Sequence, residues 1–272
     1  MKLCFTTFAC PSSSLRQVIQ LASRFQYQGI ELRIDAGHAH GVEAWSSTIE
    51  RKKFRESIEK VDLKVSCIAS SLQFTTEGII DQAAERIKLA ADMDAKGIRV
   101  FHGPLPDGMR VLAECRDRVV RQLTEAAEVA QLLETEIWIE THDMVSTGAD
   151  VAALVRAVDR PNVGVCYNNM HPIRMGESLE TTIAHLAPMI RHVHLHDGLA
   201  HPEKVIVTPV GQGEMPMDDT MQALIKIGYD QFLSGEWFHN QYGDRPEDAM
   251  ELYAHDMKIL THRYGVALGL GV

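Results

Sequence analysis

A chain of 272 residues can bury a large hydrophobic core, either as two small domains or as one large α/β barrel. Its 37 acidic and 27 basic residues give a net charge of −10, which disfavours nucleic acid or an anionic membrane as a partner. No apolar run approaches the roughly 20 residues that a membrane-spanning helix requires, and the N-terminus does not have the pattern of a signal peptide.

Short β-rich segments alternate with longer segments of helical periodicity along the whole chain. The expected strands are residues 2–8, 29–34, 64–70, 97–102, 136–142, 163–168, 190–196 and 231–238. Amphipathic stretches with apolar residues at i, i+3 and i+4 lie between them, at residues 14–26, 85–95, 115–134 and 150–158. Capping residues predict helix starts at Ser13 or Ser14, at Ser178 and at Asp218.

This alternation predicts the architecture. Strands that alternate with helices imply a parallel sheet with right-handed crossovers, and eight such units favour a barrel over an open doubly wound sheet. No GxGxxG follows the first strand, as a dinucleotide-binding sheet would require. No linker, low-complexity segment or charge block marks a domain boundary. The sequence therefore predicts an α/β protein with one domain, residues 1–272, folded as a single (β/α)8 TIM barrel.

Polar side chains, most of them of types that can bind a metal, gather at the carboxyl ends of the expected strands, where the chemistry of such barrels is located. They are Glu31, Arg33, His102, Glu140, His142, Asn168, His171, His192, His194, His196, Asp197, Glu236 and His239. Taken singly, each has a structural explanation, such as an ion pair of Glu31 with Arg33 or a turn at Asn168. Taken together, glutamates, an amide and a histidine converge from four adjacent strands, and closely placed buried carboxylates repel without a positive charge between them.

The ligand types narrow the choice of metal. Oxygen and nitrogen ligands of this kind suit Mn²⁺, Co²⁺, Mg²⁺ or Zn²⁺. His192, His194 and His196 alternate along one strand, so we expect all three to face the barrel interior, with His194 or His196 near the mouth. The five cysteines are scattered and form no CxxC pair, which indicates reduced thiols in a cytoplasm and gives no support for a structural zinc site.

Six segments together carry a family resemblance: "GIELR", "IETHD", "VGVCYNNMHP", "HVHLHDG", "VGQGEMPM" and "LSGEW". Over essentially its whole length the chain resembles the xylose isomerase-like TIM barrels, the sugar phosphate isomerases and epimerases whose fold endonuclease IV shares. The resemblance implies a divalent metal held by Glu140, Asn168, His194 and Glu236. It also implies that His171 lies beside the metal or on substrate hydroxyls. The glycine-rich segment either brings Glu214 to the mouth or forms a structural turn.

Asn168 departs from the family, which has an aspartate at this position. A neutral amide leaves two negative charges in the ligand set instead of three, and a hard divalent cation prefers charged oxygen. We therefore expect a metal site that is retained but weaker. Complete loss of the metal is the alternative.

The resemblance also implies a mechanism. The metal would hold a substrate carbonyl and its neighbouring hydroxyl, while Glu140 and Glu236 move a proton through an enediolate. His171, His102 and Arg33 are candidate substrate contacts. His142 either orients Glu140, binds substrate or has a structural role, and Trp237 forms either an apolar wall for the sugar or part of the core.

The leading prediction is thus a metal-dependent isomerase or epimerase of a sugar or sugar-like hydroxy-carbonyl compound. One alternative is a lyase similar to the 3-dehydroshikimate dehydratases, which begin with the same proton abstraction. Another is a non-catalytic sugar-binding protein with a degenerate metal site at Asn168. An endonuclease is disfavoured by Asn168 and by the net charge. Family members commonly form dimers or tetramers, which admits a homo-oligomer here.

Overall fold

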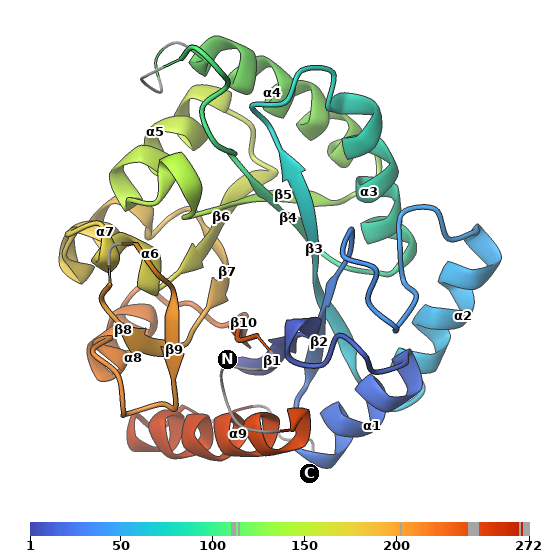
Figure 1. The fold of residues 1–272 in the computed structure, drawn as a ribbon, viewed down its shortest axis with the longest axis vertical. Coiled ribbons are helices and arrows are strands. Elements are labelled where there is room, and N and C mark those ends of the chain that lie inside the picture. Colours follow the sequence, from blue (N-terminus) through green and yellow to red (C-terminus); the bar gives the residue numbers. More distant parts are fainter. Residues whose placement is uncertain (110–112, 114, 202, 239–244, 267, 269–272) are drawn as a thin grey trace.

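The computed structural model describes residues 1–109, 113, 115–201, 203–238, 245–266 and 268. Eight parallel strands close into a barrel, with helices arranged around it (Figure 1). The barrel strands are β1 (Lys2–Thr6), β2 (Gly29–Arg33), β3 (Lys64–Gln73), β4 (Gly97–Phe101), β5 (Glu136–Glu140), β6 (Val163–Asn168), β7 (Ile190–His194) and β10 (Phe232–Gly235). Around the barrel they follow the order β1, β10, β7, β6, β5, β4, β3, β2. The predicted (β/α)8 TIM barrel is confirmed.

The helices cover the outside of the barrel. They are α1 (Leu15–Arg24), α2 (Thr48–Glu59), α3 (Ile80–Asp92), α4 (Arg116–Leu132), α5 (Gly148–Val158), α6 (Met170–Arg174), α7 (Leu179–Leu186), α8 (Met217–Lys226) and α9 (Pro246–Arg263). Short 3-10 turns, η1 (Thr7–Ala9) and η3 (Asp143–Val145), follow β1 and β5. No helix in the described part of the chain is both long and apolar enough to cross a membrane.

The helix starts agree with two of the three predicted caps. Ser14 is the N-cap of α1, and Ser178 is the N-cap of α7, where its hydroxyl accepts a hydrogen bond from the backbone N–H of Thr181. The prediction for Asp218 is wrong, because α8 begins at Met217 and its N-cap is Pro216, two residues before Asp218. Asp218 instead accepts hydrogen bonds from Arg263 at 2.5 Å and from the Tyr264 hydroxyl at 2.6 Å.

Helices on one side and side chains on the other bury the strands on both faces. Every residue of β2 and β6 is buried. Trp138 of β5 lies in the barrel interior beside Cys67 and Cys166, with its ring stacked on His192 at 5.4 Å. Because side chains alternate along β5, Trp138 and Glu140 face the same side, and Trp138 fills the layer beneath the strand ends. None of the five cysteines forms a disulfide, as predicted.

The segment after β7 forms an antiparallel hairpin that the sequence did not indicate. Its strands are β8 (Asp197–Leu199) and β9 (Ile206–Thr208). The Asp197 carboxylate accepts backbone hydrogen bonds from Gly198, Gly211, Gly213 and Met215 at 2.8–3.2 Å, so it holds the glycine-rich segment in place. Glu214 accepts a hydrogen bond from the Ala200 backbone. The segment is thus held as a turn, in line with the structural alternative, although Asp218 does not cap the helix that follows it.

Candidate metal centre and active site

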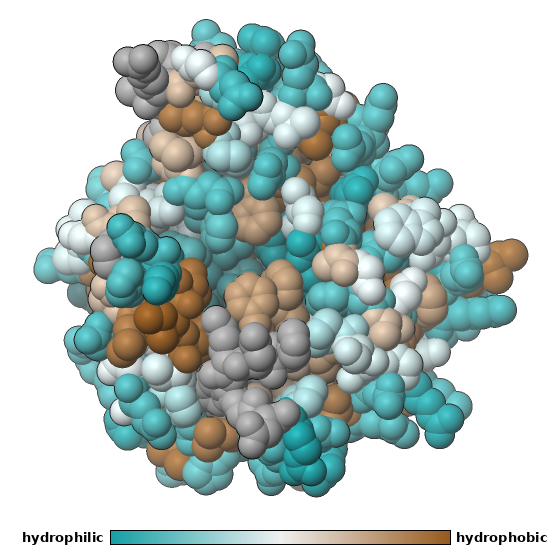
Figure 2. Space-filling view, in the orientation of Figure 1, coloured by the Kyte–Doolittle hydropathy of each residue, from teal (hydrophilic) through white to brown (hydrophobic). Residues whose placement is uncertain are grey.

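A cavity of about 120 Å³ lies at the carboxyl ends of the strands. Six of the residues proposed from the sequence line it: Glu140, His142, His171, His196, Glu236 and Trp237. Its walls are largely aromatic and aliphatic, with Phe8, Phe101, Val205 and Val207 among them. On the face viewed in Figure 2, the surface over the β8–β9 hairpin is strongly hydrophobic. The cavity therefore combines a few polar groups with apolar walls, as is typical of small-molecule sites.

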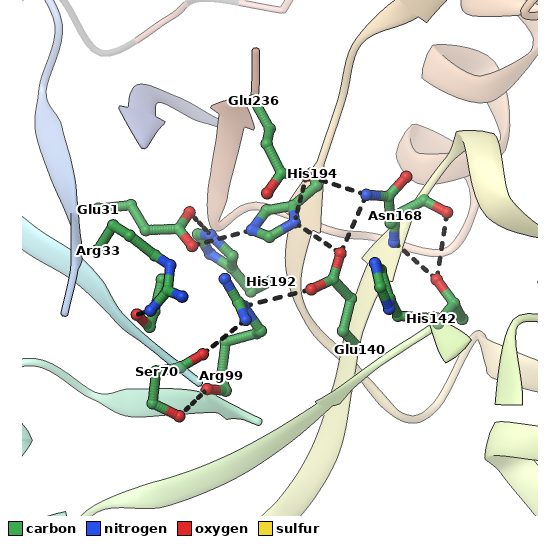
Figure 3. A network of polar contacts seen from close by, with 12 residues as sticks. Glu31, Arg33, Ser70, Arg99, Glu140, His142, Asn168, His192, His194 and Glu236 are labelled. Atoms are coloured by element: carbon green, nitrogen blue, oxygen red, sulfur yellow. Dashed lines mark hydrogen bonds and ion pairs between the residues drawn. The ribbon is translucent and has the colours of Figure 1, made fainter. Parts of the chain in front are cut away.

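Two carboxylates and one imidazole meet at the floor of this cavity (Figure 3). His194, the last residue of β7, places Nδ1 at 3.1 Å from Glu140 Oε1 and at 3.2 Å from Glu236 Oε2. Glu140 ends β5, and Glu236 directly follows β10. One ligand atom from each of the three residues lies within 4.8 Å of the other two. Two carboxylate oxygens and one ring nitrogen thus converge on a volume that one ion can fill.

Asn168, at the end of β6, lies between the two glutamates. Its amide nitrogen donates to Glu140 Oε1 at 3.0 Å and to Glu236 Oε2 at 3.1 Å. Its Oδ1 accepts the backbone N–H of Met170 at 3.2 Å. Because a backbone N–H can only donate, this bond fixes which end of the amide faces which partner. The nitrogen therefore faces the carboxylates, and Asn168 must turn its amide by half a rotation to offer the oxygen to a metal.

Glu31 supports the cluster from the opposite side of the His194 ring. Its carboxylate lies 2.9 Å from His194 Nε2 and 2.9 Å from His192 Nε2, and it accepts a hydrogen bond from the Ser234 hydroxyl at 2.6 Å. Burial alone would raise the pKa of Glu31, but the adjacent His194 and His192 hold it well below its usual value. A carboxylate on the far nitrogen of a metal-binding histidine fixes the ring orientation and directs the other nitrogen toward the metal.

The suggested ion pair between Glu31 and Arg33 is therefore wrong. Both side chains project from the same face of β2, but the carboxylate is taken by the histidines of β7. The Arg33 guanidinium donates instead to the backbone carbonyls of Ile34 and Ala69 and to the Ser71 hydroxyl. Burial, followed by the charge of Arg99, lowers the pKa of Arg33 to about 10. Arg33 does not line the cavity, although its guanidinium lies 5.2 Å from the centre of the Phe8 ring, which does.

Arg99 of β4 is a site residue that the sequence analysis missed. It is 1% exposed, and its Nε lies 3.2 Å from Glu140 Oε2, while its Nη1 donates to the Ser70 carbonyl at 2.7 Å. The guanidinium also lies 4.1 Å from the centre of the Phe101 ring. A single charged residue within the apolar strand "GIRVF" was the available sign. A charge in a strand buried on both faces needs a partner in the lumen.

These neighbours set the charge of the two glutamates. Burial alone would raise the pKa of Glu140, but His194 and Arg99 outweigh it and hold this pKa well below the usual range. The pKa of Glu236 is lowered in the same sense, chiefly by His194, against burial and the charge of Glu140. Both side chains are therefore carboxylates, which is the form that binds a metal or accepts a proton.

The chemistry of the donor set fits a divalent metal. Three protein ligands with a free coordination position is the arrangement typical of catalytic metal sites, and Glu140, His194 and Glu236 supply three. Asn168 can add a neutral carbonyl oxygen only after the amide rotation described above. The structure thus contains a candidate divalent metal site with three ligands in place. The fourth, Asn168, directs its amide nitrogen toward the site and its oxygen away from it.

The remaining residues proposed from the sequence divide by position. His142 lines the cavity with Nδ1 at 2.7 Å from Asp143 Oδ1, and it makes no hydrogen bond to Glu140 within the described chain. His171 also lines the cavity, with its ring centre 4.6 Å from that of His142. Trp237 is 1% exposed and both lines the cavity and packs on Tyr253.

His102 is not brought to the cluster. It follows Phe101, and because successive side chains of a strand point to opposite faces, Phe101 lines the cavity while His102 lines a separate one of about 270 Å³. Its Nδ1 lies 2.8 Å from the Gly103 carbonyl oxygen. His196 is placed as expected near the mouth, where it lines the cavity. His239 lies outside the described residues.

Comparisons with known proteins find relatives in sequence and in fold. The curated inosose isomerase of Bacillus velezensis is 25% identical over 254 residues, covering 89% of this chain and 90% of that protein. The crystal structure of an IolI protein with a bound zinc atom superposes with a TM-score of 0.84 at 21% identity, covering 97% of this chain and 99% of the other. A D-psicose 3-epimerase crystallised in the presence of D-fructose gives a TM-score of 0.79 at 18% identity, covering 96% and 99%.

The family follows from a match to most of the chain. Residues 19–262 match the family profile described as xylose isomerase-like TIM barrel. This span contains seven of the eight barrel strands and every residue of the cluster formed by Glu140, Asn168, His194 and Glu236. The chain belongs to the xylose isomerase-like TIM barrel family.

Proposed function

We propose that the protein is a divalent-metal-dependent isomerase or epimerase of a sugar or sugar-like hydroxy-carbonyl compound. The observation that carries the proposal is the convergence of Glu140 and Glu236 on His194 Nδ1, at 3.1 and 3.2 Å, on the floor of a cavity. The similarity to an inosose isomerase supports an inosose, a cyclic polyol ketone, as the first substrate to test.

Glu140, His194 and Glu236 would hold the metal, with Asn168 as a weaker fourth ligand through its carbonyl oxygen. A bound divalent metal polarises the substrate carbonyl and stabilises the negative charge that develops when a neighbouring C–H proton leaves. Its identity among Mn²⁺, Co²⁺, Mg²⁺ and Zn²⁺ is open, since all four accept oxygen and nitrogen ligands.

The two glutamates are proposed as the acid/base pair, and their surroundings differ. Both oxygens of Glu140 are engaged: Oε1 by Asn168 and His194, and Oε2 by Arg99. Only Oε2 of Glu236 has partners among the described residues, and the Glu236 side chain is 18% exposed compared with 2% for Glu140. Glu236 is therefore better placed to accept the first proton. Glu140 starts as a carboxylate, so it would deliver a proton on the opposite side after taking one up from water.

The walls of the cavity favour a compact substrate. Phe8, Phe101, Trp237 and Val207 provide apolar surface, and the polar groups lie on the floor and at His142 and His171. Such a division fits a molecule with hydroxyl groups around its edge and C–H groups on its faces. His142, His171 and Trp237 are proposed substrate contacts. His102 and Arg33, which do not line the cavity, are weaker candidates.

The cellular setting is proposed on general grounds. Five buried cysteines without a disulfide suit a reducing cytoplasm. The net charge of −10 argues against a nucleic-acid partner.

A turnover assay tests the proposal. Purified protein is supplied in turn with Mn²⁺, Co²⁺, Mg²⁺, Zn²⁺ or chelator and incubated with an inosose, with ketohexoses including D-psicose, and with 3-dehydroshikimate. We expect metal-dependent interconversion of one of the hydroxy-ketones, and loss of activity in Glu140→Gln and Glu236→Gln. Glu214→Gln is the matched control, because this exposed carboxylate binds only a backbone N–H within the described part of the chain.

The alternatives give different results in the same assay. Loss of water from 3-dehydroshikimate without interconversion of ketoses would assign a dehydratase. A sugar that raises the melting temperature without metal dependence or turnover would assign a binding protein. Full activity in both glutamine variants would overturn the assignment of the glutamates.

A further inference from the structure

Arg174 and His171 form a contact that the proposed mechanism does not use. Both lie on the short helix α6, three residues apart, so their side chains share one face of the helix. Arg174 Nη1 lies 3.0 Å from His171 Nδ1. His171 is 7% exposed and lines the cavity, whereas Arg174 is half-buried and does not line it.

The guanidinium is anchored by a second contact. Arg174 Nε donates to the backbone carbonyl of His201 at 2.8 Å. His201 lies in the connection between β8 and β9, the hairpin that supplies Val205 and Val207 to the cavity wall. Two contacts at different nitrogens fix both the position and the plane of the guanidinium, so its Nη1–H is held toward the imidazole.

The contact determines where His171 carries its proton. Every nitrogen of a guanidinium donates and none accepts, and arginine stays charged under all ordinary conditions. His171 Nδ1 must therefore accept, which requires a lone pair on that nitrogen. A neutral imidazole with a lone pair on Nδ1 has its proton on Nε2. Nε2 makes no hydrogen bond within the described chain, and His171 borders the cavity.

We propose that Arg174 is a positioning residue that holds His171 as a neutral imidazole protonated on Nε2, so that His171 presents one fixed hydrogen-bond donor to a substrate oxygen. The proposal rests on the proposed function only for the identity of that oxygen, which would be a hydroxyl, a carbonyl or the oxyanion that forms next to it.

This assignment removes two other roles from His171. An Nε2 that carries a proton cannot bind a metal ion, and it cannot accept a proton from the substrate. The surroundings favour the neutral ring: burial, and then the neighbouring His142, lowers the pKa of His171 to about 3. His171 thus distinguishes substrates by whether they offer an acceptor oxygen at its position.

The protonated nitrogen can be identified directly. Nitrogen NMR of protein labelled with ¹⁵N-histidine, prepared without metal or substrate, separates ring nitrogens that carry a proton from those that carry a lone pair. His171 is assigned among the 13 histidines from the signals missing in His171→Gln. We expect one tautomer at pH 7, with the proton on Nε2, in the native protein. A proton on Nδ1, or on both nitrogens, would overturn the proposal without any further variant.

Variants at Arg174 provide the second test. Arg174→Met removes the donor and is expected to give a mixture of tautomers, whereas Arg174→Lys keeps an obligate donor and should restore the native pattern. Arg156→Met is the matched control, because Arg156 also donates to a backbone carbonyl, that of His185, but lies away from the site. A native tautomer in Arg174→Met would show that Arg174 does not position His171.

Kinetics separate this proposal from the proposed function. On a substrate that the native enzyme converts, Arg174→Met should lower kcat/KM about tenfold, the worth of one hydrogen bond to a substrate oxygen, with recovery in Arg174→Lys. An unchanged kcat/KM would contradict the role in substrate binding. If the protein converts no ketose but His171 carries its proton on Nε2, the proposed function is wrong and the role of Arg174 in positioning His171 stands.

Discussion

Asn168→Asp is expected to lower the stability of the metal-free protein and to raise its affinity for metal. The Asn168 amide donates to two buried carboxylates, Glu140 at 3.0 Å and Glu236 at 3.1 Å. A hydrogen bond to a charged group contributes about 1.5–3 kcal/mol, so losing both lowers the free energy of unfolding by about 3–6 kcal/mol. A proton on the new carboxyl would restore only one of the two bonds, so the loss stays above about 1.5 kcal/mol.

The gain in metal affinity follows from the added charge. Unit charges 4 Å apart interact by about 4 kcal/mol at an effective dielectric constant of 20, and the metal carries two charges. Even about 2 kcal/mol, half of the value for two unit charges, corresponds to an affinity gain of roughly thirtyfold. The substitution also removes a rotation that metal binding requires. Asn168 must turn its oxygen away from the Met170 N–H to reach a metal, whereas an aspartate has a second oxygen on the side of the cluster.

Two measurements check the prediction. Urea unfolding in the presence of chelator gives the stability of the metal-free form, and calorimetric titration with Mn²⁺ gives the affinity. Asn169→Asp is the matched control, because among the described residues the Asn169 amide contacts the backbone of His196 and the sulfur of Met217, but no carboxylate. It should destabilise the protein without changing the affinity. If Asn168→Asp is as stable as the native protein in chelator, or binds Mn²⁺ no more tightly, the account of this amide is refuted.

Three further variants test other buried side chains that carry or avoid a charge. Glu31→Gln should lower metal affinity 10–100-fold, measured by calorimetry, because it weakens the hold on His194 Nε2. Arg99→Met should cost about 3–5 kcal/mol of stability in urea, because Glu140 loses its buried cation, and adding Glu140→Gln should restore part of the loss. Burial lowers the pKa of His40 from 6.5 to about 4, so the folded state favours the neutral ring. The free energy of unfolding is therefore unaffected by His40 above pH 6.5 and falls by about 3 kcal/mol as the pH drops toward 4, because the unfolded chain binds the proton more readily. This fall should be absent from the unfolding curves of His40→Gln.

Matched controls separate these effects from general damage. Glu43→Gln removes another buried carboxylate, one that binds the Asp35 backbone away from the cluster, and should leave metal affinity unchanged. Arg51→Met removes a buried arginine that is paired with Asp92. Adding Glu140→Gln to this variant should restore none of the lost stability. His255 lies exposed on α9, and His255→Gln should leave the pH dependence of stability as it is. If the variant and its control behave alike, the corresponding contact does not have the stated role.

The barrel was predictable because its pattern is repeated eight times. Each strand is a short β-branched or apolar run, and the helices between them show their apolar spacing plainly. Local exceptions were harder to see. Asp218 has the side chain of a helix cap, but the N-cap of α8 is Pro216, two residues earlier. Asp197 looks like a ligand beside His196, yet four backbone N–H groups surround its carboxylate, and only the fold brings these groups together.

The composition of the cluster was also predictable, but its internal arrangement was not. Strand ends bring Glu140, Glu236 and the histidines of β7 together because the ends of parallel strands meet at one mouth, and the family resemblance then indicated His194 among those histidines. The direction of the Asn168 amide follows from the Met170 backbone N–H, and His196 Nε2 also lies 3.1 Å from its Oδ1; no residue pattern specifies either contact. Arg99 was missed because an isolated arginine in a strand does not reveal its partner until the neighbouring strand places Glu140 beside it.

The most direct test of the central claim is deuterium incorporation from D₂O into an inosose incubated with metal-loaded protein, followed by NMR. We expect deuterium at the carbon next to the carbonyl in both recovered substrate and product. Incorporation should disappear with chelator and in Glu236→Gln, whereas Glu214→Gln should behave as the native protein. Product formed without any deuterium, or incorporation that persists in Glu236→Gln, would contradict proton transfer through this pair of glutamates.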